Sequence, residues 1–163
     1  MVIDNKISAD LQFIGSSVRE INMTNNIIVL EDIDNRSFSI DLDLSDVHED
    51  EDDNNFLIGI VRLSVDVIVT AKNKRKTKLH ILLEGCFKSI NQSMKEEEFA
   101  AMLYINGGST LYSIARSLVS NISANTYEVG KLLLPMINMV EFLKNKLKTT
   151  DQPENNKKMK GNK

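Results

Sequence analysis

The sequence predicts an α+β fold in which helices cover one face of an antiparallel sheet. In the first half of the chain, apolar and polar residues alternate with a period of two, which is typical of half-buried strands. In the second half, apolar residues recur at helical spacing. Strands followed by helices, rather than alternating with them, favour this class over a parallel α/β arrangement.

The clearest strand is predicted between Ser37 and Ser45. One face of this segment is polar, and the other carries Phe38, Ile40, Leu42 and Leu44. The acidic and polar stretch that follows, residues 48–55, is predicted to be a solvated loop.

Two further strands are predicted to pair as a hairpin. Apolar residues of one parity run from Leu57 to Val69, and a second such series runs from Lys78 to about Ser89. The charged link from Lys72 to Thr77 is short enough to join antiparallel neighbours. Their opposite parity, which includes Cys86, is polar and is expected to face water.

A fourth strand, with weaker alternation, is predicted from Phe13 to Met23. Val18, Ile21 and Met23 are its expected apolar anchors. The β-branched run from Ile27 to Leu30 leaves two interpretations open, a short extra strand or a packed loop.

Helical signals dominate the second half. Ser93 and Glu96 form a predicted capping box that begins a short helix through about Tyr104, and Gly107 and Gly108 are expected to end it. A longer helix then presents one apolar face, formed by Leu111, Ile114, Ala115, Leu118, Val119 and Ile122.

A last helix is predicted to begin at Asn138, with Glu141 in its first turn and an apolar stripe of Met139, Leu143 and Leu147. Few apolar residues follow. We therefore expect one domain over residues 1–148 and a disordered tail over residues 149–163.

Composition excludes several classes of function. The chain has 163 residues and a formal net charge of −3, so a phosphate backbone is not an expected partner. Cys86 is its only cysteine, which excludes an intramolecular disulfide. No leader peptide is recognisable, and no apolar stretch reaches the ~20 residues that span a bilayer. We therefore expect a cytoplasmic protein without a membrane partner.

Catalytic chemistry is not expected either. His48 lies in the acidic segment and His80 on a polar strand face, where surface histidines are common. The acidic segment that starts at Asp41 does not match the pattern of an EF-hand calcium loop, because its sixth position holds Asp46 instead of glycine. The sequence therefore predicts no enzyme, no metal and no cofactor.

An apolar segment between the last two helices is the main functional signal. Loops are usually polar, so an apolar one must be buried, covered by a subunit or used for binding. Nearby methionines favour a surface that accepts varied partners. The apolar residues of this segment are Tyr127, Val129, Leu132, Leu133, Leu134, Met136 and Ile137.

Five motifs in register resemble the SecB family of export chaperones, from about Gln12 to Leu147. Residues 107–116 are similar to the start of its long helix, and residues 132–139 to its Leu-x-Leu-x-Pro-Val-Asn-Phe motif. Residues 85–87 are similar to the Gly-Ile-Phe that ends its fourth strand, and residues 19–23 and 40–44 to its first two strands.

This resemblance implies a four-stranded antiparallel sheet with a long helix and a shorter C-terminal helix packed on one face. It also implies a homotetramer, built as a dimer of dimers, with hydrophobic grooves for non-native polypeptides. Carried onto this sequence, the peptide-binding residues are Phe38, Ile40, Leu42, Leu44, Tyr112, Tyr127, Leu132, Leu134, Met136 and Met139.

The implied function is that of an ATP-independent holdase for unfolded chains or preproteins in protein export. Glu20 matches one acidic position of the surface that docks the SecA motor, whereas Thr24 and His80 replace two others. Some relatives guard the antitoxin of a toxin–antitoxin pair, and that role stays open. A small-ligand-binding or assembly protein is the alternative of another class.

Overall fold

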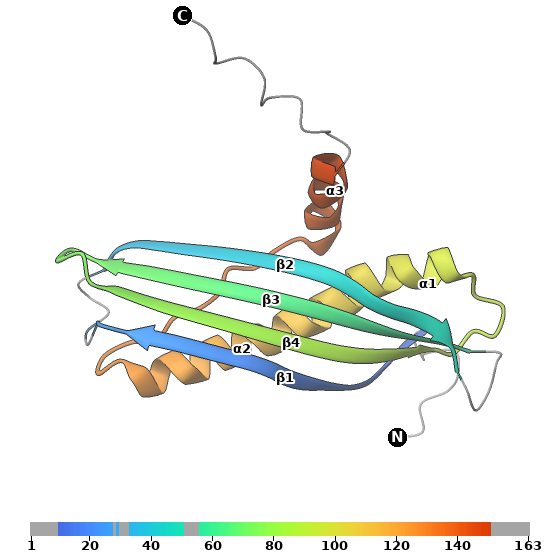
Figure 1. Cartoon of the computed structure of the whole chain (residues 1–163), viewed down its shortest axis with the longest axis horizontal. Coiled ribbons are helices and arrows are strands. Elements are labelled where there is room, and N and C mark those ends of the chain that lie inside the picture. The colour runs from blue at the N-terminus through green and yellow to red at the C-terminus, as the bar shows by residue number, and fades with distance from the viewer. Residues whose placement is uncertain (1–9, 28, 30–32, 51–55, 151–163) are drawn as a thin grey trace, which may run out of the picture.

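Four antiparallel strands form one sheet in the order β1-β4-β3-β2 (Figure 1). The computed structural model describes residues 10–27, 29, 33–50 and 56–150. The predicted hairpin forms the centre of the sheet, and the first two strands are its edges. The strands are β1 (Leu11–Asn25), β2 (Ile33–Glu49), β3 (Leu57–Ala71) and β4 (Lys76–Ser89).

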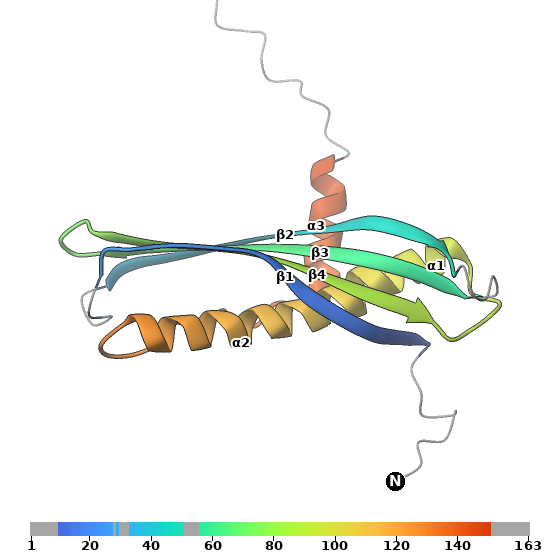
Figure 2. The same ribbon diagram turned by 60° about the horizontal axis from the view of Figure 1, so that its bottom comes forward.

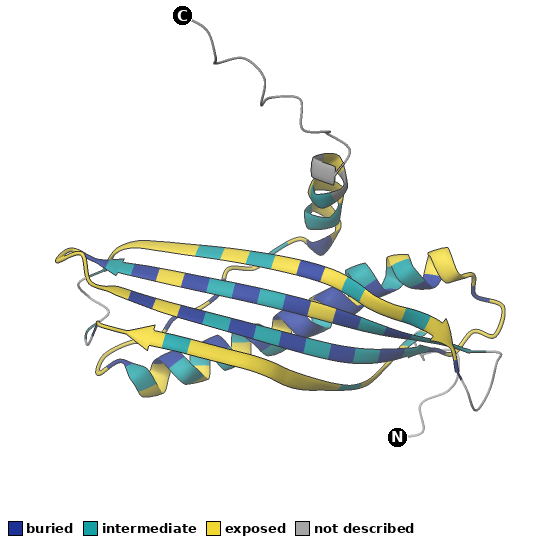
Figure 3. Cartoon of the chain, viewed as in Figure 1, coloured by how far each residue is buried: buried dark blue, intermediate teal, exposed yellow. Residues whose placement is uncertain are grey.

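Burial confirms the alternation predicted for the central strands (Figure 3). The odd-numbered apolar residues of β3 and β4 point toward the helices and form most of the core. Leu63, Val65, Ile81 and Leu83, for example, have no exposed surface. Their even-numbered neighbours lie on the opposite face, which is partly solvated.

Strand β2 begins before and ends after the predicted strand, and a bulge lets it continue past the regular alternation at its C-terminal end. Its register with β3 shifts between Leu44 and Asp46, and pairing then continues to Glu49. His48 and Glu49 are therefore strand residues and not part of the predicted loop. Residues 51–55 of that predicted loop lie outside the described residues.

The first edge strand is less protected than predicted. Val18 and Ile21 lie opposite the buried Leu83 and Ile81 of β4, so they point toward the helix side. They are nevertheless 46% and 44% exposed, because β1 has a partner strand on one side only. The expectation that both residues anchor the core is therefore wrong for a single protomer.

The segment after β1 is packed. Ile27 is buried, and Val29 forms an isolated parallel bridge with Val129. Ile28 and Leu30, the other two residues of this apolar run, lie outside the described part of the chain.

A single helical segment follows β4. It consists of α1 (Glu96–Met102), a π-helical turn η2 (Leu103–Gly107) and α2 (Gly108–Thr126). The predicted break at Gly107 and Gly108 is wrong. A Cβ atom on Gly108 would lie 2.6 Å from Leu42 Cδ2, so the glycine is needed for close packing of the helix on the sheet.

The predicted capping box is also wrong. Helix α1 begins after Lys95, whose side chain makes no capping hydrogen bond. Ser93 instead donates from Oγ to Asn91 Oδ1 at 2.8 Å, within the loop that precedes the helix.

The last helix, α3 (Met139–Thr150), begins as predicted. Asn138 Oδ1 accepts hydrogen bonds from the main-chain nitrogens of Val140 at 3.0 Å and Glu141 at 3.3 Å. The helix extends two residues past the predicted domain boundary at Lys148. The rest of the predicted tail, residues 151–163, lies outside the described chain.

The elements form two layers with an added helix at one edge. Helix α2 lies along one face of the sheet (Figure 2), and α3 stands beside β2 with its axis across the strands (Figure 1). The predicted α+β fold, with a four-stranded antiparallel sheet, a long helix and a shorter C-terminal helix, is confirmed.

Candidate functional site: an apolar linker beside the β2 edge

The chain between α2 and α3, residues 127–138, is termed the interhelical linker. It has almost no regular secondary structure, yet α2 holds it firmly along its length. Three hydrogen bonds do this: Ser123 Oγ accepts from Leu132 N at 2.8 Å, Arg116 Nε donates to Leu134 O at 3.2 Å, and Tyr112 Oη donates to Pro135 O at 2.8 Å.

The linker has one side in the core and one side in water. Leu132 and Leu134 are 1% and 2% exposed, respectively. Leu133 is 57% exposed, and Met136 is 79% exposed. Large apolar side chains that are exposed together on one surface are typical of a binding surface.

A second apolar row lies on the inner face of β2. Phe38, Ile40 and Leu44 are half-buried against the core, and Leu42 between them is 1% exposed. Because β2 is an edge strand, this row lies at the edge of the sheet beside which α3 stands.

The ten predicted peptide-binding residues are thus placed very differently. Phe38, Ile40 and Leu44 are half-buried, and Met136 is exposed. The other six are buried in the core: Leu42, Tyr112, Tyr127, Leu132, Leu134 and Met139. Burial raises the pKa of both tyrosine hydroxyls, at Tyr112 and Tyr127.

Two exposed residues of the same region were not among the predicted site residues. Leu133 follows a buried leucine in an extended segment, where neighbouring side chains alternate in direction. Val140, in the first turn of α3, is 40% exposed. The exposure of Leu133 could have been predicted from this alternation. The exposure of Val140 could not, because it depends on the orientation of α3, which the sequence does not reveal.

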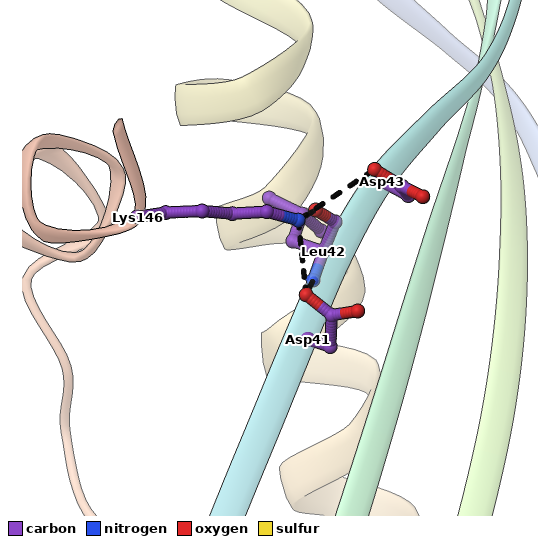
Figure 4. Close-up of polar contacts among 4 residues, drawn as sticks. All are labelled: Asp41, Leu42, Asp43 and Lys146. Atoms are coloured by element: carbon purple, nitrogen blue, oxygen red, sulfur yellow. Dashed lines mark hydrogen bonds and ion pairs between the residues drawn. The ribbon is translucent and has the colours of Figure 1, made fainter. Parts of the chain in front are cut away.

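An ionic contact joins α3 to the β2 edge (Figure 4). Lys146 Nζ lies 2.9 Å from Asp41 Oδ1 and 3.6 Å from Asp43 Oδ1, and it also donates to the main-chain oxygen of Leu42. The hydrogen bond from Lys146 lowers the pKa of Asp41. Burial lowers the pKa of Lys146, but the bond to Asp41 and the nearby carboxylates outweigh this and raise it.

The outer face of the sheet is of mixed charge. Glu84 accepts hydrogen bonds from Arg19 and Arg62, and His80 Nδ1 lies 2.8 Å from Asp66 Oδ1. Glu20, the predicted docking residue for a SecA-like motor, accepts a hydrogen bond from Asn22. Of the acidic positions that the SecB resemblance implies for SecA docking, this chain keeps Glu20, whereas Thr24 and His80 replace two others.

Metal and thiol chemistry have little support in the described residues. Among them, no group of three or more His, Cys, Asp or Glu side chains is placed to hold a metal ion. Cys86 is half-buried on the outer face of β4, and burial raises the pKa of its thiol. A raised pKa lowers the thiolate fraction and with it the nucleophilicity of the sulfur.

Across residues 10–27, 29, 33–50 and 56–150, none of the helices combines the length and the apolar character required to cross a membrane.

The arrangement of strands and helices is similar to that of solved structures. One is the Mycobacterium tuberculosis SecB-like chaperone Rv1957, in complex with a ChAD peptide from the Rv1956 HigA1 antitoxin. The two structures align with a TM-score of 0.58 and 14% sequence identity. The alignment covers 78% of this chain and 91% of the Rv1957 chain. A protein of unknown function from Streptococcus agalactiae has a TM-score of 0.43 at 10% identity, covering 77% and 97%.

No family model matches the sequence, and no curated protein matches it. At 14% identity, a structural likeness is evidence about the fold alone. The chain therefore has a SecB-like α+β fold.

Proposed function

We propose that this protein is an ATP-independent chaperone that holds unfolded polypeptides against the interhelical linker and the β2 edge. The observation that carries the proposal is the solvent-facing side of the linker, where Leu133 and Met136 are 57% and 79% exposed. The SecB-like fold supports it, because the similar structure Rv1957 is a chaperone in complex with a peptide.

The physical basis is burial of apolar client side chains. Burial contributes ~25 cal/mol per Å2 of apolar surface, so a few exposed side chains provide weak binding that depends little on the client's sequence. The flexible thioether of Met136 adapts to varied shapes. The half-buried row of Phe38, Ile40 and Leu44 extends the apolar surface toward the β2 edge.

A chaperone dedicated to one antitoxin is a second candidate. It is favoured by the peptide in the Rv1957 structure, which comes from an antitoxin. The two roles differ in client breadth, because a dedicated chaperone protects a single partner and a general holdase protects unrelated chains.

Self-association is part of the proposal. β1 has one free edge, and its exposed apolar side chains are Phe13, Ile14, Val18 and Ile21, each between 44% and 58% exposed. A second copy that covers this edge would bury them in a twofold interface, as a first step toward a dimer of dimers. Several copies would also present several client subsites, which raises avidity.

Transfer to a SecA-like motor in the cytoplasm is the less supported extension of this role. Glu20 is the candidate contact, but Thr24 and His80 lie where the resemblance implies acidic residues. We expect Glu20→Lys to leave client holding unchanged, since this side chain lies on the opposite face from the linker.

The proposal is tested by suppression of aggregation, with two unrelated unfolded proteins and no ATP. Met136→Asp is expected to reduce protection severalfold, because it places a charge on the most exposed apolar residue of the linker. Ile90→Asp is the matched control, since Ile90 is 41% exposed but follows β4, outside the linker.

Protection of both proteins by the wild type and by Ile90→Asp, but not by Met136→Asp, supports the holdase. Protection of neither contradicts a general holdase and leaves the dedicated role as the hypothesis to test next.

A further inference from the structure

The β2 edge contains a regular stretch that is suited to pairing with another strand. The register of β2 with β3 shifts between Ile33 and Asn35 and again between Leu44 and Asp46, and it is continuous between these bulges. In the described sheet, β2 pairs with β3 alone. The N–H and C=O groups along the free side of an edge strand are a template for an added strand.

Helix α3 occupies this edge through Lys146. The lysine donates to the main-chain oxygen of Leu42, near the C-terminal end of the regular stretch, and contacts Asp41 and Asp43 on either side of it (Figure 4). While Lys146 is bound to the Leu42 carbonyl, an incoming strand cannot pair with that group. A cation at an exposed edge is also a known protection against unwanted strand addition.

The contact of Lys146 is separate from the anchor of the helix. Met139, in the first turn, is 5% exposed and packs in the core. Lys146 lies seven residues later, about two turns along the helix. The helix is therefore fixed at its start by apolar packing and at its far half by an ionic contact.

The ionic contact is weak enough to open. The carboxylates of Asp41 and Asp43 are each 71% exposed, and the Lys146 side chain is 29% exposed. Ion pairs with this exposure contribute little to stability, because water and salt screen them. A client that pairs with several main-chain groups of β2 can offset that loss.

We propose that the free edge of β2 from Asn35 to Leu44 docks an extended polypeptide segment, and that α3 guards this edge through Lys146. The inference rests on the proposed function, because it names the place where the client backbone pairs. The guard protects the edge from aggregation when no client is bound, and it leaves when a client strand replaces it.

The guard is tested first without a client, by hydrogen exchange of backbone amides. Lys146→Met is expected to speed exchange about three- to tenfold in residues 35–44 and in the second half of α3. Lys144→Met is the matched control, because Lys144 contacts Glu141 of the same helix at 2.8 Å. Unchanged exchange in Lys146→Met overturns the guard.

A second variant approaches the same contact from the strand. Asp41→Asn with Asp43→Asn removes the charges that face Lys146 and keeps the side-chain volumes. It is expected to reproduce the faster exchange of Lys146→Met. Agreement of the two variants excludes misfolding of α3 as the cause, whereas faster exchange in Lys146→Met alone contradicts the ionic part of the proposed contact.

Docking is tested by fluorescence anisotropy with reduced, carboxymethylated α-lactalbumin as the unfolded probe. Lys146→Met is expected to bind about three- to tenfold more tightly than the wild type and Lys144→Met. Equal affinity despite faster exchange overturns docking at β2 and leaves the holdase standing. Binding by neither the wild type nor any variant overturns the holdase and the docking edge together.

Discussion

Glu84 is the residue that links three strands on the outer face of the sheet. Its carboxylate accepts from Arg19 Nη2 at 2.5 Å and from Arg62 Nε at 3.0 Å, which ties β4 to β1 and β3. Its side chain is 12% exposed, although both arginines are about half exposed. The hydrogen bonds from Arg19 and Arg62 lower the pKa of Glu84 below its usual 4.5.

A lowered pKa in the folded state means that Glu84 stabilises the fold when it is ionised. This contribution is present above the unfolded pKa of about 4.5 and is lost as pH falls through the lower folded pKa. We expect Glu84→Gln to reduce the free energy of unfolding by about 1 kcal/mol at pH 7. The difference from the wild type should vanish in acid.

Urea denaturation at a series of pH values that falls from pH 7 into strong acid checks this expectation. Glu20→Gln is the control, because Glu20 lies on the same strand as Arg19 and is exposed. An equal loss in both variants, or a difference for Glu84→Gln that persists in acid, contradicts the network.

At the scale of elements, glycines set how closely the helical segment packs on the sheet. A Cβ atom on Gly85 would lie 2.7 Å from Leu111 Cδ2 and 3.1 Å from Phe87 Cε2. Both neighbours are buried and have little room to move. The short distance between β4 and α2 therefore depends on a missing side chain.

We expect Gly85→Val to lower the free energy of unfolding by about 1–3 kcal/mol, through overpacking. Gly15→Val is a matched control, since Gly15 lies on the neighbouring strand beside Cys86 and a Cβ atom there would meet nothing within 4 Å. Chemical denaturation of the two variants measures the difference. A similar stability for both would show that α2 moves away from the sheet without cost.

At the scale of the whole molecule, the two edges of the sheet are treated differently. The β2 edge is covered by α3 through Lys146, whereas most residues of β1 are exposed (Figure 3), and Phe13, Ile14, Val18 and Ile21 are the large apolar ones among them. Exposed apolar side chains along the outer edge of an edge strand favour association. This difference is the basis for proposing β1 as the edge for a second copy and β2 as the edge for a client.

We expect Val18→Asp with Ile21→Asp to reduce the mass of the assembly in solution at least twofold, measured by light scattering. Ile68→Asp is the control, because Ile68 is 38% exposed and lies on β3, away from the β1 edge. A wild type that is a monomer at all concentrations tested would contradict association through β1.

Local sequence patterns are enough to predict the class of fold and most of the elements. Period-two alternation identified the inner faces of β2, β3 and β4, and helical spacing identified α2, because both patterns follow from local backbone geometry. The start of α3 was also readable, since Asn138 caps the helix through its own side chain. The full length of β2 could not be read from the sequence, because the bulge after Leu44 shifts the alternation.

The tertiary structure alone decided which apolar residues are accessible. Leu132 and Leu134 belong to the predicted groove by their type, but packing of the linker on α2 buries them and leaves Leu133 and Met136 in water. Lys146 and Asp41 meet although they are 105 positions apart. Composition and periodicity describe a residue's neighbours along the chain, whereas burial and ionic contacts depend on how distant segments pack.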